Sequence, residues 1–194
     1  MIYYVKTEGQ PDTFSVCNNR PEGAVAPKTE GTMRYIPGTG FEITMRCWET
    51  DPKAVKTEPD SAVCLDSCLE VFIDFFPELP QYGYLNVEMN SIGTVLCCIG
   101  TERKGRKRLL QMGIPQPEVK VEKTDSYWQV NCLITESLLE KVYERPCNFE
   151  PGYEMRGNFY KCGDATAAPH WATWSPVERL DFHTPEFFGT LKIV

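Results

Sequence analysis

Two neighbouring stretches, LEVFIDF at positions 69–75 and YLNVEMN at positions 84–90, decide the fold class. In each stretch the side chains alternate with a period of two, which is typical of a β-strand with one buried face. The side chains expected to face the core are those of Leu69, Val71, Ile73, Phe75, Leu85, Val87 and Met89. The sequence therefore predicts two strands with one apolar face each.

The same period recurs along most of the chain. Further strands are predicted at 41–48, 94–99, 119–122, 127–134, 153–160 and 188–194. A single helix is predicted at 135–143, where Thr135 is the expected N-cap and Pro146 lies beyond the end. Short strands separated by Gly and Pro favour a sandwich or barrel. No repeat or boundary interrupts the pattern, so residues 1–194 are expected to form one domain.

Composition limits the partners. The chain has 194 residues, a net charge of −7 and a pI near 5.0. Nucleic-acid binders usually carry a basic face, so no nucleic-acid partner is expected. No run of about 18 apolar residues is present, so no membrane partner is expected either. The N-terminal MIYYVKTEGQPD lacks the apolar run of a signal peptide.

The number and spacing of the cysteines indicate a reducing compartment. The nine cysteines are odd in number and include no CxxC pair. Several lie inside apolar strand patterns, where free cysteine acts as a small hydrophobe. We therefore expect most cysteines to be reduced and buried, in a cytoplasmic protein. Secretion is the alternative if a signal peptide has been removed from the sequence.

The one basic run is RKGRKR at positions 103–108. Gly105 at its centre indicates a hairpin tip. We expect a solvated loop that discourages edge-to-edge strand pairing, with an anion contact as the alternative.

Three regions together carry a family resemblance. They are DSCLEVFIDF (66–75) followed by YLNVEMNSIGT (84–94), then RGNFYKCGD (156–164), and finally WSPVERLDFHTPEFFGTLKI (174–193). Their order and spacing resemble the family 9 carbohydrate-binding modules, and the nearest branch is the stand-alone family 9-like proteins of gut bacteria. The likeness runs from about Phe41 to the C-terminus. The wider sandwich group includes DOMON and cytochrome-type haem domains.

This resemblance implies an antiparallel β-sandwich of the immunoglobulin-like or jelly-roll-like type. It also implies a non-catalytic module for mono- or oligosaccharides, such as xylan or cellulose fragments, in polysaccharide catabolism. In well-studied members two tryptophans hold the end of a sugar. Trp171 and Trp174 lie near the place of the downstream tryptophan, and no clear upstream counterpart precedes residues 69–75. Trp128 shares the parity of Val130 and is expected in the core.

The polar sides of the predicted strands supply candidate sugar ligands. Amide, carboxylate and guanidinium groups pair with hydroxyls, and aromatic faces cover C–H patches. With Trp171 or Trp174 as an aromatic wall, the expected ligand-binding residues are Glu70, Asp74, Asn86, Glu88, Asn90, Arg156 and Asn158. The resemblance places Glu88 and Asn90 at a polar-x-Asn pair of the sugar-reading strand. The alternative is that each polar face is the solvated side of its strand.

Other functions have weaker support. His170 and His183 show no tight metal-ligand spacing with Cys162, so we expect hydrogen-bonded structural histidines, no metal and no cofactor. A structural or haem-binding sandwich is one alternative. A weak glycoside hydrolase using Glu70, Asp74 or Glu88 is another. No catalytic or nucleotide-binding motif is present, so no enzyme is expected. The oligomeric state stays open.

Overall fold

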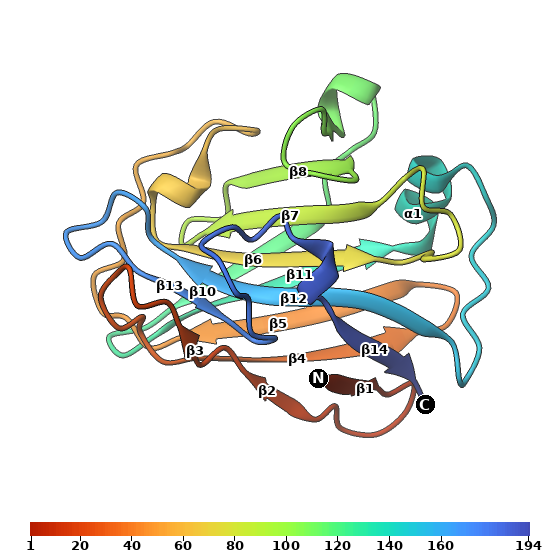
Figure 1. Cartoon of the computed structure of the whole chain (residues 1–194), viewed down its shortest axis with the longest axis horizontal. Helices are drawn as coiled ribbons and strands as arrows, with labels where there is room; N and C mark the ends of the chain where they lie inside the picture. The colour runs from red at the N-terminus through yellow and green to blue at the C-terminus, as the bar shows by residue number, and fades with distance from the viewer.

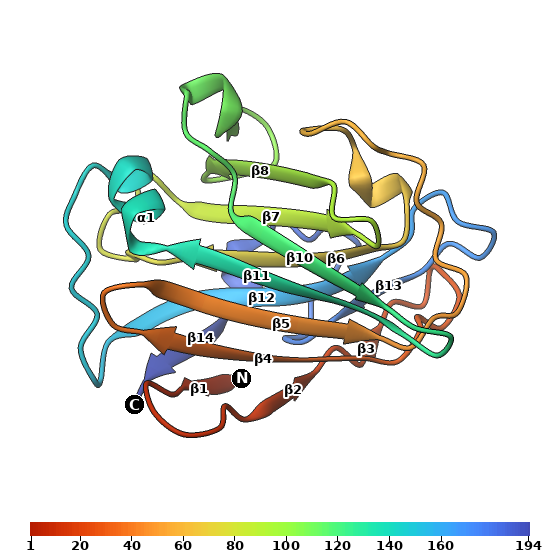
Figure 2. The same ribbon diagram turned by 180° about the vertical axis from the view of Figure 1, so that it is seen from behind.

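The computed structural model describes residues 1–194 as a β-sandwich of two sheets. Strands comprise 42% of the chain and helices 9%. The single α-helix, α1 (Glu136–Tyr143), lies at one end of the sandwich (Figures 1 and 2). The all-β prediction is confirmed.

The larger sheet has nine strands. Its main order is β1 (Ile2–Val5), β14 (Gly189–Ile193), β12 (Glu154–Cys162), β6 (Cys68–Asp74), β7 (Tyr84–Asn90), β8 (Val95–Gly100) and β9 (Lys107–Arg108). Beside β12 lie β13 (Trp171–Thr173) and β3 (Asn18–Asn19). The smaller sheet has the order β10 (Glu118–Lys123), β11 (Trp128–Thr135), β5 (Gly40–Cys47), β4 (Thr29–Ile36) and β2 (Thr13–Ser15). Every pairing is antiparallel except β1 with β14.

The predicted strands and the helix are present, with ends that shift by one or two residues. The Thr135 side chain caps α1 by accepting a hydrogen bond from Leu138 N at 3.1 Å. The N-terminal strands were not predicted. In β4 the alternation is interrupted by Gly31, where a Cβ atom would lie 2.5 Å from the Phe14 ring. Glycine is therefore required there for packing, although it weakens the strand signal.

The two sheets enclose one hydrophobic cluster of 39 buried residues. The core-facing side chains predicted from LEVFIDF and YLNVEMN all belong to it, and so does Trp128. Phe14 of β2 stacks on Phe159 of β12 with ring centroids 3.9 Å apart. The core therefore joins the unpredicted N-terminal strands to the predicted ones.

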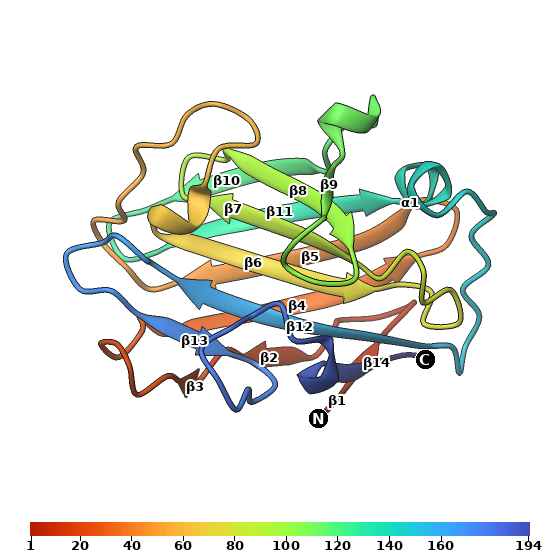
Figure 3. The same cartoon turned by 45° about the horizontal axis from the view of Figure 1, so that its top comes forward.

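The outer face of the larger sheet is covered as well. The segment between β13 and β14, which includes the short helix η3 (Pro185–Phe187), lies over β12 (Figures 1 and 3). Beneath it a second cluster of ten residues includes Phe72, Tyr84 and Tyr160 with Phe182 and Phe188. The alternative of a solvated polar face on these strands is therefore wrong, because their outward-facing aromatic side chains are covered by this segment.

Six of the nine cysteines are buried, whereas Cys64 and Cys147 are half-buried and Cys17 is exposed. The expected burial is confirmed for most of them. No helix has the length and apolarity needed to cross a membrane.

Candidate functional site

A cavity of about 360 Å³ opens on the outer face of the larger sheet, over β6, β7 and β8. Glu70 of β6, Glu88 of β7 and Leu96 of β8 line its floor together with Cys162 of β12. The walls are loops: the β8–β9 hairpin, the β12–β13 connection and residues 180–183 before η3. Its volume falls within the range of about 300–1,000 Å³ typical of small-molecule sites.

Two carboxyl groups lie side by side on the floor. Glu70 and Glu88 are direct partners across the β6–β7 pair, and both are buried. Burial, together with the charge of Glu88, raises the pKa of Glu70 well above its usual range, although the Cys162 thiol donates to it at 2.9 Å. Burial raises the pKa of Glu88 to about 7, against the opposing charge of Arg106. The pair therefore retains a proton near neutral pH and offers both a donor and acceptors.

A polar chain holds Glu88 in place. Arg106 Nη1 donates to Asn86 Oδ1 at 2.8 Å, and Asn86 Nδ2 donates to Glu88 Oε1 at 3.0 Å. Arg106 Nη1 also lies 3.6 Å from Glu88 Oε1. A Cβ atom on Gly100 would lie 2.9 Å from Arg106 Cγ, so the glycine leaves room for the arginine.

The basic run therefore differs from its prediction. Gly105 is at the turn with φ of 80°, as expected for a hairpin tip. However, β9 pairs back onto β8 and folds the loop over the sheet, so that Arg103 and Arg106 line the cavity. The solvated-loop expectation is wrong for Arg106, whose side chain is only 17% exposed.

Two aromatic side chains, those of Trp171 and Phe182, form part of the wall. Trp171 is half-buried and lines the cavity, and its Nε1 donates to Asp164 Oδ1 at 2.7 Å. Gly23 lies against this indole, because a Cβ atom there would be 2.8 Å from the ring. Phe182 also lines the cavity and stacks on Tyr160 with centroids 4.1 Å apart. These contacts hold both rings in fixed positions.

Both histidines are hydrogen-bonded, as predicted. His183 lines the cavity, and its Nδ1 lies 2.8 Å from the Tyr84 hydroxyl. His170 is buried, with Nδ1 2.8 Å from Ala168 O and Nε2 2.9 Å from Lys161 Nζ.

Four of the nine predicted ligand residues come together at this cavity. Glu70, Glu88 and Trp171 line it, and the buried Asn86 is hydrogen-bonded to two of its lining residues, Glu88 and Arg106. Their contact with a ligand stays a prediction.

Two predicted residues instead hold loops. Asn90 Nδ2 donates to Lys56 O at 2.8 Å, and its Oδ1 accepts from Thr94 N at 2.9 Å. Asn158 both donates to Ser175 O at 2.9 Å and accepts from Ser175 N at 2.8 Å. Both amides are fully buried and satisfied by the protein, so they shape the surroundings of the cavity without lining it.

The other three predicted residues lie elsewhere. Trp174 is in the main core, packed edge-on against Phe159, so it is not a wall of this cavity. Asp74 and Arg156 are cross-strand partners at the far end of β6 and β12. Arg156 Nη2 donates to Phe188 O at 2.6 Å. Alternation identifies the face of a strand but not the position along it, and this explains the difference for Asp74 and Arg156.

Sequence reasoning missed the loop residues of the site. Arg103, Arg106, Asp164, Phe182 and His183 all line the cavity, and none was predicted as a ligand. The basic run and the family stretch LDFHTPEFF contain four of them. Their positions depend on how loops fold over the sheet, which local pattern does not report.

Fold and site together define a β-sandwich with a polar, aromatic-walled cavity on the outer face of one sheet. The family model described as "Carbohydrate-binding family 9" matches residues 38–193. The chain therefore belongs to carbohydrate-binding family 9. No curated protein is similar to it by sequence.

Several solved structures share the fold. One is a proposed carbohydrate-binding protein from Bacteroides uniformis ATCC 8492, with 23% identity, a TM-score of 0.78, and coverage of 100% of this chain and 99% of the other. A family 9 module from Caldicellulosiruptor kristjanssonii in complex with cellotriose has 10% identity, a TM-score of 0.73, and coverage of 100% and 93%. The same type of module in complex with glucose has 10% identity, a TM-score of 0.72, and coverage of 100% and 96%.

Proposed function

We propose that this chain is a non-catalytic carbohydrate-binding protein that holds the end of a mono- or oligosaccharide in the cavity over β6–β8. The observation that carries the proposal is the placement of the Trp171 ring beside the Glu70–Glu88 pair in one cavity. Family membership supports the same role.

The chemistry of the cavity suits a sugar. An aromatic face covers the C–H patch of a pyranose ring, and fixed polar groups pair with its hydroxyls. The protonated member of the Glu70–Glu88 pair donates to a hydroxyl oxygen, whereas the ionised member and Asp164 accept from hydroxyl groups. Arg103 and Arg106 donate from the hairpin side. These groups surround a hydroxylated ligand on more than one side.

The proposed ligand is a glucose-type sugar or a short oligosaccharide released from cellulose or xylan. Two structurally similar family 9 modules were solved with glucose and cellotriose. The floor of the cavity is the β-sheet itself, so a sugar chain enters with one end and its remaining units extend outward. This geometry favours a role in polysaccharide catabolism through capture of chain ends.

Binding is favoured over hydrolysis by the positions of the carboxyl groups. Glycosidases place two carboxyl groups on either side of the scissile bond. Here Glu70 and Glu88 are neighbours on one sheet face, and both form the floor. A sugar above them has both groups on the same side.

The test begins with thermal shift against glucose, xylose, cellotriose and xylotriose, because a ligand of the folded state raises the melting temperature. Calorimetry then measures affinity, which we expect between micromolar and millimolar, about −4 to −8 kcal/mol. Trp171→Ala should weaken binding at least tenfold, since stacking contributes about 0.5–1.5 kcal/mol beyond the buried area. Trp48→Ala, directly after β5 of the smaller sheet, is the matched control. Equal loss in both variants, or no binding by any sugar, would refute the proposal.

We also propose a reducing compartment, because three free thiols lie at or directly beside the cavity floor, those of Cys64, Cys68 and Cys162. Thiol titration of protein purified without reductant tests this, with nine free thiols expected.

A further inference from the structure

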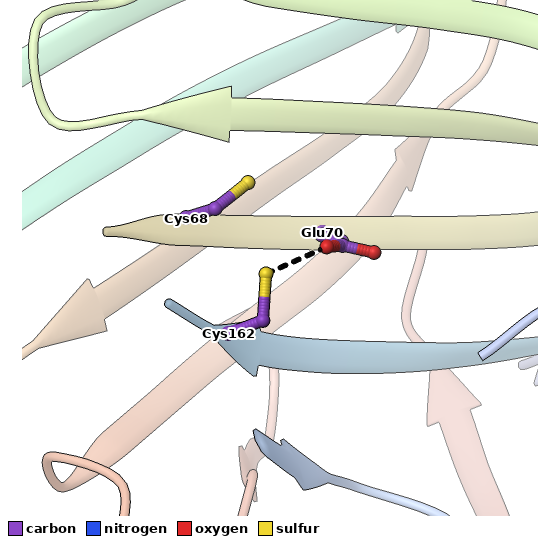
Figure 4. A group of neighbouring side chains, drawn as sticks. All are labelled: Cys68, Glu70 and Cys162. Atoms are coloured by element: carbon purple, nitrogen blue, oxygen red, sulfur yellow. Dashed lines mark hydrogen bonds between the residues drawn. The ribbon is translucent and has the colours of Figure 1, made fainter. Parts of the chain in front are cut away.

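Three metal-binding side chains converge beneath the cavity. The Sγ atoms of Cys68 and Cys162 and a carboxylate oxygen of Glu70 all lie within 4.8 Å of one another, and all three residues are buried. Figure 4 shows the Cys162 sulfur directed at Glu70, to which it donates at 2.9 Å. Cys68 is the first residue of β6, and its sulfur lies within 4.8 Å of the other two donor atoms.

Strand register produces this convergence. Cys68 of β6 and Cys162 of β12 are direct cross-strand partners. Glu70 follows Cys68 by two positions, so its side chain leaves β6 on the same face. The three donors therefore form a triangle on one face of a sheet, and two of its corners, Glu70 and Cys162, line the cavity.

We propose that Cys68, Cys162 and Glu70 form a binding site for a thiophilic divalent cation of the zinc type, with the fourth coordination position facing the cavity. Zn²⁺ takes thiolate sulfur at about 2.3 Å and carboxylate oxygen at about 2.0–2.2 Å in tetrahedral sites. Those bond lengths place the ligand atoms about 3.5–3.8 Å apart. The donors already lie within 4.8 Å, so small rotations of the side chains close the remaining gap.

Charge and protonation are consistent with such a site. Coordination requires thiolates, so each cysteine gives up its thiol proton to the solvent when the cation binds. Binding of the cation therefore forms two metal–sulfur bonds and releases two thiol protons, with a further proton from Glu70 where it is protonated. Two thiolates and one carboxylate exceed the charge of a divalent ion by one, and the neighbouring charged groups are of both signs, Arg106 on one side and Glu88 and Asp164 on the other.

The other buried cysteines lack this arrangement. Cys97 and Cys132 belong to the main core, and neither belongs to a cluster of three donors. No metal was expected from the sequence, because His170 and His183 show no tight ligand spacing with Cys162. Cys68 and Cys162 are 94 positions apart, and strand pairing brings them together.

The test is titration of the reduced, full-length protein with Co²⁺ as a spectroscopic substitute, followed by displacement with Zn²⁺. A thiolate-to-cobalt charge-transfer band and one equivalent of bound metal are expected. Cys68→Ser and Cys162→Ser should each weaken binding more than about 100-fold, because loss of an outer-shell partner alone costs 10–100-fold. Cys17→Ser, at an exposed cysteine, should bind as the wild type does. Circular dichroism checks that each variant is folded.

The metal proposal and the proposed sugar-binding function can be refuted independently of one another. Cys68→Ser should abolish the cobalt band without changing sugar affinity, since Cys68 does not line the cavity. Trp171→Ala should weaken the sugar and leave the cobalt band unchanged. The metal proposal is overturned by absence of the band in reduced wild-type protein. It is also overturned by equal metal binding in the Cys68→Ser, Cys162→Ser and wild-type proteins, or by a Cys68–Cys162 disulfide that persists in reductant.

Discussion

Replacement of Glu88 by Gln should make the protein more stable at pH 8 and leave its stability at pH 4 unchanged. Glu88 lies on the cavity floor, only 4% exposed, where burial raises its pKa from 4.5 to about 7. Each pKa unit corresponds to 1.36 kcal/mol between the two protonation states, so the rise corresponds to about 3 kcal/mol. The wild type thus holds a buried group whose ionisation opposes folding.

The direction follows from proton linkage. Below pH 4.5 the carboxyl is protonated in both the folded and unfolded states, and it makes no pH-dependent contribution. As pH rises from there to about 7, the unfolded state loses its proton first, so the free energy of unfolding falls. Above about pH 7 the decrease in the free energy of unfolding is complete. Glutamine carries no charge and keeps an oxygen that can accept from Asn86 Nδ2, so the variant avoids this loss.

Urea denaturation of wild type and Glu88→Gln between pH 4 and 8 measures the difference. We expect curves that coincide at pH 4 and separate by about 3 kcal/mol at pH 8. Glu150→Gln, at an exposed position, serves as the control and should follow the wild type. A Glu88→Gln protein that is less stable than wild type at pH 8 would show that the Arg106 contact outweighs burial. The same variant should bind sugar more weakly, as expected when a functional group lowers stability.

Three further substitutions test other contacts. Lys161→Ala should lower the free energy of unfolding by about 3–5 kcal/mol and the melting temperature by roughly 10 °C. The reason is that the fully buried Lys161 ammonium is hydrogen-bonded to Ser67, Cys162 O and His170 and lies 3.7 Å from Glu49. A decrease below about 1 kcal/mol in urea denaturation contradicts this. Gly23→Ala should weaken sugar binding, because the added Cβ atom would displace the Trp171 ring. Unchanged affinity in calorimetry would show that Gly23 does not position this ring for the sugar. Thr135→Ala should destabilise by about 1 kcal/mol through loss of the α1 N-cap, with no effect on sugar binding.

Strand pattern was sufficient to predict most of the sandwich. The alternation in β6 and β7 is local, and it placed Leu69 and Val87 in the core and Glu70 and Glu88 on the opposite face. In β4 the strand signal is weakened because packing against Phe14 requires a glycine, and β2 and β3 are only three and two residues long.

The cavity was only partly predictable, because its walls are loops. Alternation does not show that the segment after β13 covers the outer face, nor that Arg106 folds back to Glu88. It also does not separate Trp171 from Trp174, which lie three positions apart. The first lines the cavity and the second fills the core, a difference decided by packing against Gly23 and Gly189 respectively.

The most direct test of the sugar site is the indole N–H region of the nuclear magnetic resonance spectrum during titration with glucose and cellotriose. The chain has four tryptophans, so four indole signals are expected, each assigned from a Trp→Phe variant. Sugar in the cavity should shift the Trp171 signal with a saturable dependence on concentration and leave those of the buried Trp128 and Trp174 nearly unmoved. A shift confined to Trp48, directly after β5 of the smaller sheet, or no shift at millimolar sugar, would contradict the account.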